Sequence, residues 1–187
     1  MATREDFTLA FELLLGHEGA FSGIRTDPGN WTSGRVGVGE LRGTKWGISA
    51  AAYPHIRDIR NLRVEQARDI YFDDYWTRAF CHEMPPRLAF VHFDAAVNNG
   101  PSRAVRWLQQ AIGAGVDGVY GPQTRERMQA AVERDETHLI TEYHAHRLRF
   151  MVELTTWGTF RGGWSRRLVK VPFEAAAYWP RGESVTA

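Results

Sequence analysis

Two carboxyl groups and a hydroxyl near the start of the chain have the side-chain types needed to cleave a glycosidic bond. If the helix predicted over residues 3–15 continued, Glu18 would fall on its buried stripe, where burial raises the pKa of a carboxyl group. An acid that keeps its proton near neutral pH suits general acid catalysis. Asp27 lies in a Thr-Asp-Pro-Gly turn that leaves a carboxylate hydrated and ionised. Glycosidic hydrolysis requires such a pair across a cleft, and the hydroxyl of Thr44 is suited to holding a water molecule.

Aromatic side chains near these residues are suited to form flat apolar walls for sugar rings. They are Phe21, Trp31, Trp46 and Trp76. The carboxyl groups also fit a plainer interpretation, because a glutamate after a helix-ending glycine is commonly solvated and Asp-Pro-Gly is commonly only a turn. Spacing alone leaves both interpretations open.

The elements that must position these residues are mostly helices. Apolar residues recur at helical spacing in six segments, and proline or glycine marks most of their ends. The predicted helices cover residues 3–15, 62–76, 86–98, 101–112, 122–132 and about 135–157. Residues 19–49 are glycine-rich instead, and Arg35-Val36 is predicted to contribute to a small hairpin. The fold class is therefore mainly α (α+β), with a small Gly-rich β and loop insert near the N-terminus.

Composition excludes several classes of protein. The 187 residues are 43% hydrophobic and 24% charged, with a net charge of +1, which is typical of a globular domain without a strong electrostatic grip on nucleic acid. Cys81 is the single cysteine and cannot form an internal disulfide. The first residues lack the apolar core of a secretion signal, and no stretch approaches the ~18 apolar residues of a membrane-spanning helix. We therefore expect synthesis in the cytosol, no stable membrane insertion, no nucleic-acid partner and a monomer.

Three ordered segments resemble the front of the glycoside hydrolase family 108 muramidases. They are Gly16-His-Glu-Gly19, Asp27-Pro-Gly29 and Gly43-Thr-Lys-Trp-Gly-Ile-Ser49. The resemblance implies a lysozyme-like fold in which Glu18 protonates the glycosidic oxygen. Asp27 would steady the oxocarbenium-like transition state or help to activate water, and Thr44 would position that water. The sequence departs from the family at Ala20, which replaces a second glycine, and at Asn30–Arg42, an insert that offers Glu40 as a rival carboxylate.

Further segments resemble the peptidoglycan-binding region that follows the hydrolase segment in this family. They are residues 93–101, 107–110, 117–124 and 160–164, followed by Arg167. The resemblance implies a catalytic region over residues 1–92 and a peptidoglycan-binding region over 93–180, packed into one lysozyme-like unit. Asn98, Trp164 and Arg167 are its candidate substrate contacts, with Arg167 suited to stem-peptide carboxylates. Trp164 equally suits a role in closing the core, and Asn98 suits a role in satisfying backbone groups at a helix break.

Other catalytic chemistries find no support in the sequence. The best histidine cluster is His138, His144 and His146, but the last two are about 200° apart on a helix and cannot share one metal ion. Cys81 lacks the surroundings of a nucleophile, and Gly39–Lys45 has neither the spacing nor the order of a phosphate-binding loop. We therefore expect no metal and no cofactor.

Taken together, the resemblance implies a peptidoglycan hydrolase of the lysozyme class. Such an N-acetylmuramidase cleaves the β-1,4 bond between N-acetylmuramic acid and N-acetylglucosamine. The resemblance further suggests a bacteriolytic, antimicrobial endolysin of a bacteriophage or prophage. It would stay in the host cytoplasm until a holin or another export route delivered it to the cell wall in the periplasm. The alternatives are a catalytically silent wall-binding or secretion-accessory protein of the same fold, and a lytic transglycosylase that uses Glu18 alone.

Overall fold

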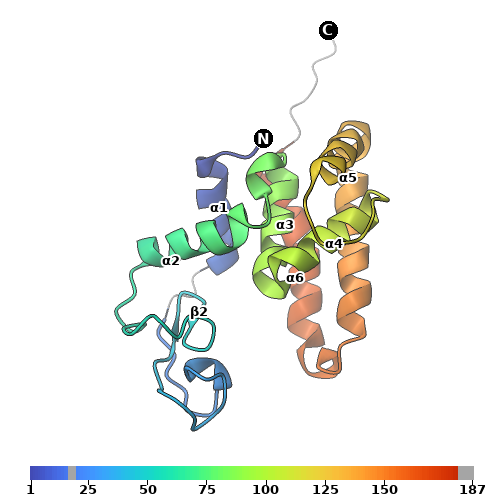
Figure 1. The fold of residues 1–187 in the computed structure, drawn as a ribbon. Coiled ribbons are helices and arrows are strands. Elements are labelled where there is room, and N and C mark those ends of the chain that lie inside the picture. Colours follow the sequence, from blue (N-terminus) through green and yellow to red (C-terminus); the bar gives the residue numbers. More distant parts are fainter. Residues whose placement is uncertain (17–19, 181–187) are drawn as a thin grey trace. The chain divides into compact units, whose positions relative to one another are not determined.

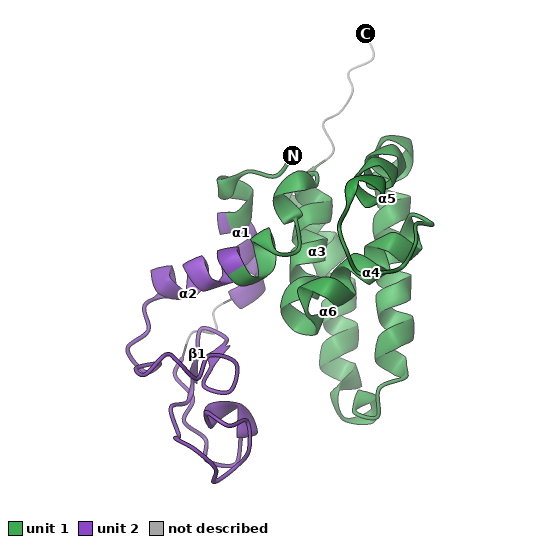
Figure 2. Ribbon diagram, viewed as in Figure 1, with its two compact units in different colours: residues 1–7, 74–187 green, residues 8–73 purple. Residues whose placement is uncertain are grey.

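The computed structural model describes residues 1–16 and 20–180 of the chain (Figure 1). The chain divides into two compact units (Figure 2). One unit consists of Met1–Phe7 and Asp74–Ala187, and the other of Thr8–Asp73. The described residues form six α-helices and one two-stranded sheet, so the predicted mainly helical fold with a small β insert is confirmed.

The first helix, α1 (Arg4–Leu15), begins and ends on local signals that the sequence contains. The backbone N–H of Asp6 donates to Thr3 Oγ1 at 3.2 Å, and the N–H of Thr3 donates to Asp6 Oδ2 at 2.7 Å. This reciprocal pair is a capping box in which aspartate replaces the usual glutamate. Gly16 ends the helix in the left-handed region, at φ 57°.

The unit Thr8–Asp73 contains the small sheet. Its strands β1 (Thr44–Lys45) and β2 (Ile48–Ser49) pair antiparallel, with Thr44 opposite Ser49. The prediction of a strand at Arg35-Val36 is wrong, because these residues lie in turns between glycines that adopt positive φ. The N–H of Val38 donates to the carbonyl of Arg35 at 3.1 Å, so the backbone here closes a tight turn and does not pair with another strand.

Helix α2 (Val64–Tyr71) continues as a π-helix over Phe72–Thr77. The predicted helix over residues 62–76 is therefore present, but its last turns form a π-helix instead of an α-helix. Tyr71 is buried on α2, packs edge-on against Phe11 at 5.3 Å between ring centroids, and directs its hydroxyl towards Gly47.

The other unit is organised around α3 (Pro86–Asn99), which packs against α4 (Pro101–Ala111), α5 (Pro122–Val152) and α6 (Trp157–Tyr178). Nine consecutive residues of α3, from Leu88 to Ala96, are buried, as expected for a helix covered on all sides. Gly100, at φ 89°, separates α3 from α4 at the predicted break.

Helix α5 is kinked at Asp135, whose φ of −166° and ψ of 96° are not helical. Asp135 Oδ1 accepts the N–H groups of Thr137 and His138 at 3.0 and 3.1 Å, so it caps the second half of the helix. Two predicted helices are thus confirmed, but the second ends at Val152 and not at Trp157. A new helix, α6, begins at Trp157.

Among residues 1–16 and 20–180, no helix combines the length and the hydrophobicity that crossing a bilayer requires.

Candidate functional site

The predicted general acid, Glu18, lies outside the described residues, so its role stays a prediction. The described part of the candidate site lies in the unit Thr8–Asp73 and contains Asp27 and Thr44. Asp27 precedes a 3-10 helix over Pro28–Asn30, and its Oδ1 accepts the N–H of Gly29 at 2.8 Å. The Asp27 side chain is exposed, which agrees with a hydrated carboxylate held in a turn.

Asn30 links this turn to Thr44. The Asn30 side chain is fully buried, and its Nδ2 donates to the carbonyl of Ile24 at 3.0 Å. This bond fixes the orientation of the amide, so Oδ1 is the atom that accepts the hydroxyl proton of Thr44, at 2.8 Å. The lone pairs of Thr44 Oγ1 are therefore left to accept a hydrogen bond from a water molecule.

The insert Asn30–Arg42 does not carry Thr44 away from the turn, because its two ends are joined. The carbonyl of Asn30 accepts the N–H groups of Arg42 and Gly43, each at 3.0 Å. Within the insert, Trp31 pairs with Leu41 in an isolated bridge. Sequence reasoning marked Asn30 only as the start of the insert, and its residue type alone gave no signal of its buried role.

Glu40, the rival carboxylate, is held in an ion pair. Its Oε2 lies 2.9 Å from Arg42, and the Arg42 guanidinium also donates to the carbonyl of Pro54 at 2.8 Å. The Glu40 side chain is 71% exposed. This ion pair holds the end of the insert in place, which gives the Glu40 carboxylate a structural role.

Three of the predicted aromatic walls are half-buried in this unit. The indole N–H of Trp31 donates to the carbonyl of Arg25 at 2.8 Å, and that of Trp46 donates to the carbonyl of Leu62 at 3.1 Å. The ring of Phe21 lies under the guanidinium of Arg60, with 4.0 Å between the Arg60 Cζ and the ring centroid. Each of the three rings is thus fixed in place while part of its surface stays accessible.

Trp76 has a different position. Only 1% of it is exposed, and its ring packs edge-on against Phe7 and Phe93 with centroid distances of 5.3 and 5.4 Å. A ring covered on all sides by the core of its unit has no surface for a sugar, so we assign Trp76 to packing and do not carry it into the proposed site.

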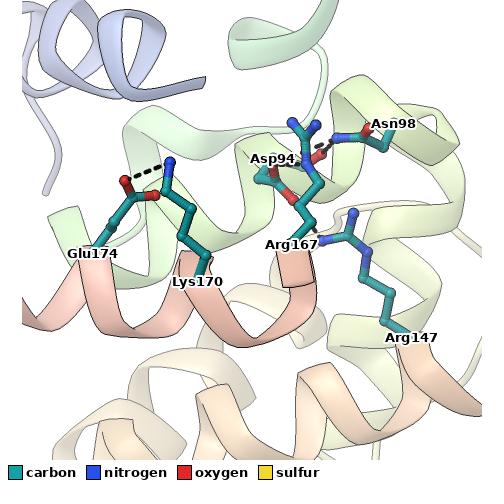
Figure 3. A network of polar contacts seen from close by, with 6 residues as sticks. All are labelled: Asp94, Asn98, Arg147, Arg167, Lys170 and Glu174. Atoms are coloured by element: carbon teal, nitrogen blue, oxygen red, sulfur yellow. Dashed lines mark hydrogen bonds and ion pairs between the residues drawn. The ribbon is translucent and has the colours of Figure 1, made fainter. Parts of the chain in front are cut away.

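Two candidate contacts of the peptidoglycan-binding region, Asn98 and Arg167, meet at the buried Asp94 of α3 (Figure 3). Asp94 Oδ2 accepts from Arg147 of α5 at 2.6 Å, and Oδ1 accepts from Arg167 Nε of α6 at 2.6 Å. The Asp94 and Arg147 side chains are 1% exposed, whereas Arg167 is 34% exposed. Asn98 donates to the carbonyl of Asp94 at 2.6 Å, which is the backbone role expected at a helix break. The partners of Asp94 are therefore two arginines from distant helices, which no local sequence pattern indicates.

Two of the resembling segments in this unit also contact each other. The amide of buried Gln109 accepts the N–H groups of Asp117 and Gly118 at 3.1 and 2.9 Å and donates to Asp117 Oδ1 at 2.7 Å. Hydrogen bonds from the Val119 N–H and from Gln109 lower the pKa of Asp117. Asp117 therefore stabilises the loop in which it lies.

Among the described residues, no group of three or more histidine, cysteine, aspartate or glutamate side chains could bind a metal ion. His144 is half-buried on α5, and the partial loss of hydration together with the charge of Arg147 lowers its pKa to about 4.

Two protein families match successive parts of this chain. Residues 11–100 match the glycosyl hydrolase 108 family, and residues 103–169 match a family described as a predicted peptidoglycan domain. The chain thus carries a glycosyl hydrolase 108 domain followed by a peptidoglycan-binding domain, which confirms the resemblance seen in the sequence motifs.

Among solved structures, the chain is similar to SagA of Brucella abortus. The two are 26% identical, with a TM-score of 0.77, over 98% of this chain and 100% of that chain. No curated protein sequence gives a significant match. The matched families meet between residues 100 and 103, while the compact units meet at Asp73–Asp74. The division at residues 92 and 93 stays a prediction.

Proposed function

We propose that this protein is an N-acetylmuramidase that hydrolyses the β-1,4 bond between N-acetylmuramic acid and N-acetylglucosamine in peptidoglycan. The observation that carries the proposal is the match of residues 11–100 to the glycosyl hydrolase 108 family, followed by a peptidoglycan domain. Glu18, Asp27 and Thr44 all fall within the first match. The turn at Asp27 and the bond between Thr44 and Asn30 support the assignment of the second and third residues.

In this mechanism Glu18 donates its proton to the glycosidic oxygen as the bond to C1 of the muramic acid breaks. The exposed carboxylate of Asp27 stabilises the positive charge that develops on the sugar ring or helps to deprotonate the attacking water. Thr44 accepts a hydrogen bond from that water, because its own proton is committed to Asn30. The half-buried rings of Phe21, Trp31 and Trp46 are the proposed walls for the sugars.

Digestion of purified sacculi tests the proposal. Wild-type protein should release new reducing muramic ends, and Glu18→Gln should lower the rate by about 10²–10⁴ with an unchanged circular dichroism spectrum. Glu12→Gln is the matched control, because Glu12 is an exposed glutamate of α1 and its replacement should leave the rate unchanged. Anhydro-muramic ends would instead indicate a lytic transglycosylase. Binding to sacculi without release of any product would favour a silent wall-binding protein.

The second carboxylate and the threonine are tested in the same assay. Asp27→Asn should slow hydrolysis strongly, whereas Glu40→Gln should leave the rate nearly unchanged. The opposite pattern would identify Glu40 as the second catalytic carboxylate. Thr44→Ser keeps the hydroxyl and should retain activity, whereas Thr44→Val leaves Asn30 Oδ1 buried without its donor and should lose it. If Thr44→Val keeps full activity, Thr44 does not position the water.

We further propose that the protein acts as an endolysin, which waits in the host cytoplasm and reaches the periplasm through a holin or an equivalent route. The expected result is that expression in a bacterial host lyses the cells only when a holin is expressed with it. Lysis without a holin would show that the protein reaches the wall by itself.

A further inference from the structure

One face of α6 presents three aromatic rings and an arginine in a row. Trp157, Phe160, Trp164 and Arg167 fall within about 80° of the helix circumference, at about 100° per residue. The ring centroids of Trp157 and Trp164 are 6.0 Å apart, and those of Phe160 and Trp164 are 5.6 Å apart and stacked. We call these four residues the α6 stripe.

The α6 stripe continues, towards the N-terminal end of the helix, the face that α6 buries further along. Val171 and Ala175 lie on the same face and are 4% and 0% exposed, whereas Phe160 is 51% exposed. Trp157, Trp164 and Arg167 are half-buried, so part of each side chain stays accessible beside the exposed ring of Phe160.

Arg167 adds a positive charge that its surroundings do not neutralise. Its Nε is bound to Asp94, but the same carboxylate also neutralises buried Arg147, so the three side chains together carry a net charge of +1. The neighbouring cation Lys170 is paired with Glu174 at 3.0 Å (Figure 3). Within the described residues, the two terminal nitrogens of Arg167 have no hydrogen-bond partner. A planar pair of N–H donors held in this way is suited to a carboxylate.

We propose that the α6 stripe binds a peptide-bearing glycan strand, with sugar rings stacked on the aromatic side chains and a stem-peptide carboxylate on Arg167. The inference rests on the proposed function, because it takes peptidoglycan as the ligand. All four residues lie within the segment that matches the peptidoglycan domain, and the free charge of Arg167 is complementary to an acidic peptide. Asp94 acts as a positioning residue because it holds the Arg167 guanidinium, and Arg147 in turn holds Asp94.

Binding assays without hydrolysis test this inference separately from the proposed function. Full-length protein carrying Glu18→Gln is mixed with intact sacculi, with sacculi stripped of peptides by an amidase, and with vesicles of phosphatidylglycerol. Phe160→Ala and Trp164→Ala should weaken binding to intact and stripped sacculi by about tenfold each. The matched control Phe173→Ala, on the opposite side of α6 and 73% exposed, should bind as the parent does.

Arg167→Gln should weaken binding to intact sacculi by about tenfold and leave binding to stripped sacculi unchanged. Arg166→Gln is its matched control, because Arg166 is exposed on the far side of the helix. If Arg167→Gln fails to fold, Arg167→Lys keeps the ion pair with Asp94 but lacks the paired donors, and it should lose the same preference for intact sacculi.

Several results would overturn the inference. Equal losses in the stripe and control variants would show that the α6 stripe is not a contact surface, and binding to vesicles in preference to sacculi would identify it as a membrane surface. If Arg167 variants bind intact and stripped sacculi in the parental ratio, Arg167 does not bind the peptide. Normal binding without hydrolysis by the wild type would refute only the proposed function.

Discussion

Replacing His92 with phenylalanine should make the stability of the protein less sensitive to acid. His92 is fully buried on α3 beside the ring of Tyr143, at 5.6 Å between centroids. Burial lowers its pKa from 6.5 to about 3, which the backbone of Ala79 opposes only in part. In the unfolded chain the imidazole takes up its proton near pH 6.5, whereas in the folded chain it stays neutral. The unfolded state therefore binds more protons between these values, and stability is lost as the pH falls through this window.

The size of the effect follows from the two pKa values. Each pKa unit is worth about 1.36 kcal/mol, so His92 should lower the free energy of unfolding by about 3 kcal/mol between about pH 7 and pH 4. His144, whose pKa is about 4, acts in the same direction and should contribute a similar loss. Between these pH values, His92→Phe should therefore remove about half of the loss that the two histidines cause.

Chemical denaturation at a series of pH values measures this slope directly. The matched control is His138→Phe, because His138 is exposed on α5 and its replacement should leave the slope unchanged. The comparison uses the change with pH and not the absolute stability, so a better or worse fit of the phenylalanine does not affect it. If His92→Phe and the wild type lose stability in parallel, the imidazole is protonated in the folded protein and the reasoning fails.

Two further predictions concern stability. Asp94→Asn removes the anion that neutralises a buried guanidinium and should lower the free energy of unfolding by about 3–5 kcal/mol. Lys170→Gln breaks the helical ion pair with Glu174 and should cost only about 0.3–0.5 kcal/mol. If denaturant titrations give equal losses for Asp94→Asn and Lys170→Gln, burial does not strengthen the interaction of Asp94 with Arg147. Gly47→Ala should cost at least about 1 kcal/mol, because the residue has a φ of 74° and its Cβ would overlap the hydroxyl of Tyr71. Gly162→Ala, in an open helical position, should instead raise the melting temperature.

Local signals let the sequence predict much of the chain. Hydrogen bonds or backbone angles within a few residues determine the helix starts at Thr3 and Asp135, the turn at Asp27 and the break at Gly100. Such interactions form wherever the local sequence allows them, so their positions can be read before the fold is known.

Contacts between distant segments depended on the tertiary structure. Thr44 and Asn30 are fourteen residues apart, and Arg147 and Arg167 lie fifty-three and seventy-three residues beyond Asp94. Trp76 illustrates the same limit, because an aromatic residue at helical spacing suits a sugar wall or a core equally well until its neighbours are known. The residue types set which bonds each side chain can make, but the packing of helices and loops decides which partner it meets, since burial depends on the faces that come together.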